Sequence, residues 1–193
     1  EEIAVYQATS VGRHMVDIGE DSKEGALLFK KGTKLRPQEI GALSAEGFTS
    51  VKVFAPLKIS IISTGDELVA PGNEIGKGQI FDINTVALDT LATKHGFEVV
   101  STYTVKDQYE LLKEAIMEAK EKSDVVVVSG GSSKGKKDMT AQLIDELAVP
   151  GVFTHGLALK PGKPTILGAD EKEKKLLVGL PGHPVAAYFI TKL

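Results

Sequence analysis

Val125-Val126-Val127-Val128, followed directly by Ser129-Gly130-Gly131, is the most informative segment of this chain. An unbroken apolar run of this length is typical of a strand that is covered on both faces of a sheet. The glycines behind it predict a sharp turn, because glycine reaches backbone conformations that are closed to other residues. We therefore expect residues 125–128 to form a central strand with helices on either side.

Strand and helix patterns alternate on both sides of this segment. Apolar residues at helical spacing predict helices, and short apolar runs between them predict strands. This alternation is typical of an α/β fold, and we expect a three-layer sandwich with a mostly parallel sheet. The expected strands are residues 58–62, 97–103, 125–128, 165–167 and 176–178, and the expected helices are 84–95, 111–119 behind a capping box at 107–110, 138–147 and 184–190.

The first 55 residues are turn-rich and differ from the rest. Short strands are expected at residues 4–7, 26–29 and 50–54, with one helix that starts at Pro37. We expect residues 1–55 to be a small β-containing N-terminal appendage and residues 56–193 to be the α/β domain. The chain starts without Met and stops inside an expected helix, so we expect a piece of a longer protein.

Composition excludes several classes of protein. The 193 residues include no cysteine, which excludes disulfides, thiolate metal sites and cysteine nucleophiles and suits the cytoplasm. The net charge of −3 does not favour a nucleic-acid partner, since duplex binders usually carry a basic excess. No apolar run is long enough to predict a membrane span, and no signal-peptide pattern is present.

Two acidic segments are candidates for chemistry. Asp66 and Glu67 follow the first strand of the α/β part behind Ser63-Thr64-Gly65, and such adjacent carboxylates could hold Mg²⁺. The alternative is a plain polar turn with Asp66 as its Asx residue. Farther on, Asp82 or Asn84 could contact a ligand, or could simply cap the helix that follows.

The glycine-rich segment 129–138 favours an anion. Glycines let a ligand approach the backbone, and the N–H groups at a helix start attract phosphate. The P-loop spacing is missing, and a flexible surface loop is the alternative. Asp138 could cap the helix, or could bind a metal ion or water.

Two Pro-Gly turns complete the candidate site. Lys160 and Lys163 flank Pro161-Gly162 and could clamp a phosphate or another oxyanion as point charges. Leu180-Pro181-Gly182-His183 lies between a strand and a helix and could present backbone donors to an anion. The four histidines lack zinc-site spacing, although His155 or His183 could act as a general acid or base. Composition and spacing together suit a phosphorylated ligand, with Mg²⁺ as the expected cofactor.

In this order and spacing, the motifs resemble the MoeA family of molybdenum-cofactor biosynthesis proteins, whose eukaryotic relatives include the gephyrin E domain. The resemblance runs from about Gly12 to the end of the chain. It rests on residues 63–68, 78–84, 129–138, 160–164 and 179–184.

The resemblance implies molybdate insertion into adenylylated molybdopterin, helped by Mg²⁺ and accompanied by hydrolysis of the adenylate. It implies metal ligation by Asp66 and Glu67, and it adds Asp138 and Lys163 to the catalytic residues. It also implies molybdopterin and molybdate as partners, a homodimer in the full-length protein, and no nucleic acid or membrane partner. The expected ligand-binding residues are Thr64, Gly65, Asn84, Ser129, Gly130, Gly131, Ser132, Ser133, Gly135, Lys160, Pro161, Gly162, Pro181 and Gly182.

The chain departs from the family pattern at three points. Lys136 and Lys137 precede Asp138, and this stretch looks more like the sister MogA/MoaB family, which adenylylates molybdopterin. His183 stands where the family commonly has Asn. The flanking domains of the family are missing, so the isolated chain is expected to turn over poorly. A molybdopterin adenylyltransferase, a non-catalytic binding or scaffold module, and a nucleotide-processing relative on the same fold, as in competence-damage proteins, remain alternatives.

Overall fold

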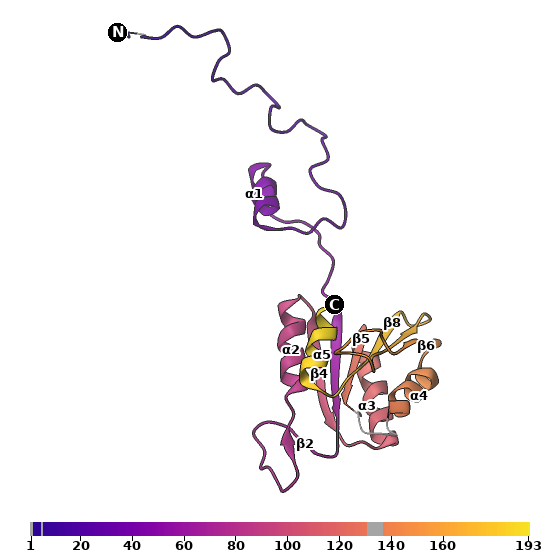
Figure 1. The fold of residues 1–193 in the computed structure, drawn as a ribbon. Helices are drawn as coiled ribbons and strands as arrows, with labels where there is room; N and C mark the ends of the chain where they lie inside the picture. The colour runs from indigo at the N-terminus through magenta and orange to yellow at the C-terminus, as the bar shows by residue number, and fades with distance from the viewer. Residues whose placement is uncertain (1, 5, 131–136) are drawn as a thin grey trace. The chain divides into compact units, whose positions relative to one another are not determined.

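The computed structural model describes residues 2–4, 6–130 and 137–193. The chain divides into two compact units, Glu1–Val53 and Phe54–Leu193 (Figure 1).

The first unit contains the helix α1 (Pro37–Ala45) and, among its described residues, no strand. Arg36 and Glu39 hold the start of α1 through a hydrogen bond from Arg36 N to Glu39 Oε2 at 2.9 Å and a side-chain ion pair. The strands expected at residues 26–29 and 50–54 are therefore wrong, and the one at 4–7 includes Val5, outside the described residues. A short strand needs a partner to be stable, and local sequence does not reveal whether one exists.

The second unit is an α/β sandwich around a six-stranded sheet, which confirms the predicted fold class. The strand order is β4-β1-β5-β8-β7-β6, and a separate pair, β2 and β3, forms a small parallel sheet. Strands β4, β1, β5 and β8 are parallel, and β7 runs antiparallel to both of its neighbours, β8 and β6. The bounds are β1 Lys58–Thr64, β2 Leu68–Val69, β3 Ile80–Phe81, α2 Asn84–Lys94, β4 Glu98–Val105, α3 Tyr109–Lys122, β5 Val125–Gly130, α4 Lys137–Leu147, β6 Pro150–His155, β7 Ile166–Asp170, β8 Lys175–Leu180 and α5 Pro184–Lys192.

The core lies on both faces of this sheet. Because side chains alternate along a strand, Ile62 faces one apolar cluster and its neighbour Ile61 faces the other. The central strand β5 divides in the same way: Val126 and Val128 pack with α3 and α4, and Val127 packs with α2 and α5. The Val run is thus covered on both faces, as predicted.

The strand directions bring six chain segments to one edge of the sheet. Thr64, at the end of β1, pairs with Val105 of β4 and Gly130 of β5, and Ser129 pairs with Leu180 of β8. Since β7 is antiparallel to β8, its first residue, Ile166, lies at this edge too, beside the end of β6. We call this the carboxyl edge and the other one the amino edge. No helix among the described residues has the length and apolar character needed to cross a membrane.

Candidate functional site

The loop that follows β1 is tied to the end of β4 by side-chain hydrogen bonds. Thr64 Oγ1 donates to Asp107 Oδ1 at 2.6 Å, and the Asp107 backbone N–H donates to Asp66 Oδ1 at 3.1 Å. The carboxylates of Asp66 and Glu67 are exposed, whereas Thr64 and Gly65 are buried. The hydrogen bonds to Asp107 therefore fix this loop, and the loop presents two exposed carboxylates at the carboxyl edge.

A cleft of about 400 Å³ opens beside this loop, and we call it the acidic cleft. Its lining includes Glu67, Asp82 and Asp107, together with apolar side chains such as Phe81 and Pro184. Asp107 was not among the predicted site residues. The sequence Asp107-Gln108-Tyr109-Glu110 resembles a capping box, yet the N-cap of α3 is Gln108 and no side chain caps this helix.

Asp82 supports the structure of the cleft floor. Its buried carboxylate accepts hydrogen bonds from the Thr85 N–H at 3.1 Å, Thr85 Oγ1 at 2.6 Å and Thr104 Oγ1 at 2.9 Å. These three donors, from α2 and β4, supply the hydrogen bonds that a carboxylate needs when it is buried away from water. Of the two roles left open for Asp82, the structure favours holding the start of α2.

Asn84 joins two loops of the carboxyl edge. Its Nδ2 donates to Ser129 Oγ and to the Gly182 carbonyl, both at 2.8 Å. Its Oδ1 is buried and has no hydrogen-bond partner among the described residues. Because an unpaired buried acceptor is costly, this atom calls for an explanation.

Gly130, the last residue of β5, allows the closest backbone approach in the site. Its φ is +138°, and a Cβ on it would lie 2.0 Å from the Thr64 carbonyl oxygen. Only glycine fits here. The other members of the predicted cradle, Gly131, Ser132, Ser133 and Gly135, lie outside the described residues; Asp138 falls in α4, and its side chain is not described.

A second cleft, of about 630 Å³, lies on the other side of Gly130, and we call it the lysine cleft. Lys163, His155 and Thr140 line it, and Pro181 closes one side. Of the two predicted clamp lysines only Lys163 lines this cleft; Lys160 is exposed on the same turn.

The turn that carries Lys163 is rigid. Gly162 has a φ of +118°, and a Cβ on it would lie 2.3 Å from Ile190 Cδ1. Thr165 Oγ1 donates to the Gly162 carbonyl at 2.7 Å, and the Leu157 N–H donates to the Lys163 carbonyl at 2.9 Å. The backbone thus fixes the base of the Lys163 side chain, while its ammonium end is exposed.

The described residues contain no group of three or more His, Asp or Glu side chains that could hold a metal ion. Mg²⁺ often binds through one or two carboxylates and completes its shell with water and substrate phosphate. Asp66 and Glu67 therefore fit at most a partial site that a ligand would complete.

Comparison of the sequence with known proteins identifies the family of this chain. Residues 60–193 match the family model described as a probable molybdopterin binding domain. A molybdopterin molybdenumtransferase of Haemophilus influenzae is 35% identical over 170 residues, which is 88% of this chain and 41% of that protein. A putative molybdopterin biosynthesis protein of Methanocaldococcus jannaschii is 33% identical over 193 residues, 96% of this chain and 47% of that protein.

Solved structures agree with this placement. Two crystal structures of MoeA proteins from Pyrococcus horikoshii share 43% and 30% identity with this chain, with TM-scores of 0.73 and 0.69. The alignments cover 88% and 90% of this chain, and 41% of each of those chains. The chain thus spans less than half the length of the relatives it matches.

Proposed function

The chain belongs to the family of molybdopterin-binding domains of MoeA type, and we propose that its carboxyl edge binds molybdopterin during molybdenum-cofactor biosynthesis. The observation that carries this proposal is the convergence of two clefts on Gly130, which lines both of them. In open α/β sheets, ligands bind at this edge.

The phosphate of the ligand is assigned to the lysine cleft. Lys163 supplies a positive charge there, and Gly130 lines the same cleft at the end of β5. His155 and Thr140 add side chains that can donate hydrogen bonds. This arrangement would position a phosphorylated ligand without a covalent step.

For the full-length protein, we propose the insertion of molybdate into adenylylated molybdopterin. Asp66 and Glu67 would hold Mg²⁺ together with ligand oxygens, and the ion would neutralise phosphate charge. Lys163, with Lys160 beside it, would attract molybdate or phosphate oxygens. Support comes from the names of the relatives at 33–35% identity and from the exposed carboxylates of this loop.

A molybdopterin adenylyltransferase is the second candidate function. The Lys136-Lys137-Asp138 stretch favours it, and Thr140, one turn into α4, lines the lysine cleft. ATP consumption in the presence of molybdopterin separates the two functions, because only the adenylyltransferase uses ATP.

Calorimetric titration with molybdopterin tests the proposal. We expect saturable binding by the chain, and binding about tenfold or more weaker by Lys163→Ala, since a charged hydrogen bond is worth about 1.5–3 kcal/mol. Lys172→Ala is the matched control, because Lys172 is an exposed lysine in the β7–β8 turn at the amino edge. Equal loss in both variants, or no binding by the folded chain, would contradict the proposal.

A further inference from the structure

The six-stranded sheet has two outer strands, β4 and β6, and β6 is protected against further pairing. The free side of an outer strand carries unpaired N–H and C=O groups, to which another strand can pair. In β6, Pro150 has no N–H, and the Val152 N–H donates to Asp145 Oδ1 at 2.7 Å. The pairing of β6 with β7 is also irregular directly after Val152. This side of the sheet is therefore closed.

The free side of β4, the one that faces away from β1, is open. Residues 99–105 are Val-Val-Ser-Thr-Tyr-Thr-Val, with no proline and no charge, and such residues favour strands. The Val105 carbonyl accepts from the Gly65 N–H at 3.1 Å, so it points toward the end of β1. Because these groups alternate along a strand, the N–H and C=O groups of Thr102 and Thr104 point away from β1. They have no backbone partner among the described residues.

The helices do not extend over this free side. Both α2 and α3 pack on β4 and on its neighbour β1, so they lie above and below this pair of strands. Thr102 and Thr104 are exposed. The irregularity in the pairing of β4 with β1 lies at Val100, before this stretch, and residues 101–105 pair regularly. Another strand can therefore reach the backbone of β4 over residues 101–105.

The charges at the ends of β4 fit an identical strand in antiparallel orientation. Glu98, its first residue, and Lys106, directly after its last, are both exposed. In an antiparallel pair of two copies centred on Thr102, the start of each strand lies beside the end of the other. Each Glu98 then lies near Lys106 of the other copy, and opposite charges across a strand pair stabilise it. A parallel pair would bring like charges together.

We propose that β4 is a docking surface for a second copy of this chain, and that the two sheets join antiparallel through β4 with a two-fold axis at Thr102. Each Thr102 N–H then donates to the Thr102 carbonyl of the other copy, and Ser101 lies opposite Tyr103 of the other copy. The strands of the two sheets run in opposite directions, so their carboxyl edges lie at opposite ends of the joined sheet. The candidate ligand site of each copy stays open.

An introduced thiol tests the position of the two-fold axis, because the chain has no cysteine. Thr102→Cys should form a disulfide between copies under mild oxidation. Residues of a hydrogen-bonded antiparallel pair have Cα atoms about 5.5 Å apart, which a disulfide can span. Thr104→Cys is the matched control, since its two copies would lie more than about 13 Å apart, the rise of four residues along a strand. Equal crosslinking of both variants, or none in Thr102→Cys, would overturn the proposal.

Sedimentation equilibrium of charge-reversal variants tests the orientation of the strands. Glu98→Lys and Lys106→Glu should each weaken the dimer at least about fivefold, because each brings like charges together at both ends of the strand pair. The combined variant should restore the wild-type affinity. Glu171→Lys and Lys172→Glu, in the exposed β7–β8 turn, are the matched controls and should leave the dimer unchanged. No restoration in the combined variant would refute the antiparallel arrangement.

Thr102→Pro tests the backbone pairing. It removes an N–H that points away from β1, at a position where an outer strand tolerates proline. The variant should keep the circular dichroism of the wild type and sediment as a monomer. If it does not fold, the crosslinking and the charge reversals still decide. A wild-type chain that is monomeric at about 1 mM, or a dimer that neither the charge reversals nor Thr102→Pro weakens, would refute the proposal.

Discussion

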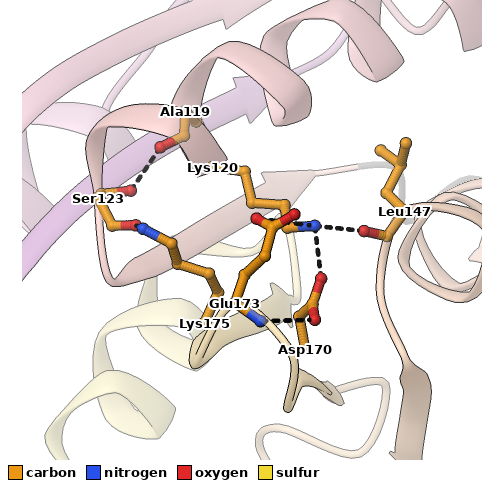
Figure 2. A network of polar contacts seen from close by, with 7 residues as sticks. All are labelled: Ala119, Lys120, Ser123, Leu147, Asp170, Glu173 and Lys175. Atoms are coloured by element: carbon orange, nitrogen blue, oxygen red, sulfur yellow. Dashed lines mark hydrogen bonds and ion pairs between the residues drawn. The ribbon is translucent and has the colours of Figure 1, made fainter.

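Replacing Lys120 by Met is expected to destabilise the α/β domain by about 3 kcal/mol or more. Lys120 Nζ, near the end of α3, lies 2.6 Å from Asp170 Oδ2 and 3.4 Å from Glu173 Oε2, and it also donates to the Leu147 carbonyl (Figure 2). The side chains of Lys120 and Asp170 are only 10% and 6% exposed.

The magnitude follows from what the substitution leaves behind. Met keeps an apolar stem of similar length but cannot donate, so Asp170 retains the Glu173 N–H at 3.1 Å and loses its cation. Breaking a buried ion pair by removing one partner costs about 3–5 kcal/mol, because the remaining charge stays desolvated. The Leu147 carbonyl at the end of α4 loses a donor as well.

Urea denaturation followed by far-UV circular dichroism measures this loss. Lys122→Met is the control on the same helix, since Lys122 pairs with Glu118 four residues away at the surface, where such pairs are worth about 0.3–0.5 kcal/mol. The double variant Lys120→Met/Asp170→Leu should lose less stability than Lys120→Met, because no unpaired charge remains. A Lys120→Met loss no larger than that of Lys122→Met would refute the reasoning.

The same pair predicts a pH dependence. The Lys120 ammonium, hydrogen-bonded to Asp170, holds the pKa of that carboxyl below its usual value. A carboxyl with a depressed folded-state pKa stabilises the protein above its unfolded-state pKa, and this contribution is lost as the pH falls through the folded-state value. The stability difference between the wild type and Lys120→Met should therefore be largest near neutral pH and shrink in acid below the ordinary Asp range.

Two further substitutions test the floor of the site, each by thermal denaturation. Gly130→Ala should abolish folding or lower the melting temperature severely, because the new Cβ would lie 2.0 Å from the Thr64 carbonyl oxygen. Gly72→Ala is the control, since Gly72 also has a positive φ, +95°, but no atom within 4 Å of a new Cβ. It should lower the melting temperature far less. Asp82→Asn should cost about 1–3 kcal/mol, because an amide nitrogen, which accepts no hydrogen bond, would replace the oxygen that accepts from Thr85 and Thr104. A neutral result would show that these bonds do not hold α2.

Local sequence was sufficient for the elements that depend on local patterns. The Val run and the helical face of α3 were predicted because burial on both faces and helical spacing are visible within a few residues. β6 was missed, because Pro150 and Gly151 look like a loop and only pairing with β7 makes the segment a strand. The acceptor role of Asp107 was missed because its partner, Thr64, lies 43 residues earlier in the chain.

The candidate site was predictable as a set of loops, but not as two clefts. Strand order decides which loops meet, and the antiparallel β7 is what brings Lys163 to the carboxyl edge next to Gly130. Lys160 and Lys163 are equivalent in the sequence, yet only Lys163 lines the lysine cleft. The roles predicted for Asp66, Glu67 and Asp138 stay predictions.

The Lys120 network and the ligand clefts lie at opposite edges of the same sheet, and this separation predicts that stability and binding can be changed independently. Helix α3 runs back against the parallel strands, so its end meets the β7–β8 turn at the amino edge, where Asp170 pairs with Lys175 in register. Lys163 stands at the carboxyl edge, where the proposed function gives it a role in ligand binding and none in bracing the fold. Lys120→Met should therefore lower the unfolding free energy and leave the ligand affinity of the folded chain unchanged. Lys163→Ala should lower the ligand affinity and leave the unfolding free energy unchanged. Loss of affinity in folded Lys120→Met would show that the two edges are coupled through the sheet.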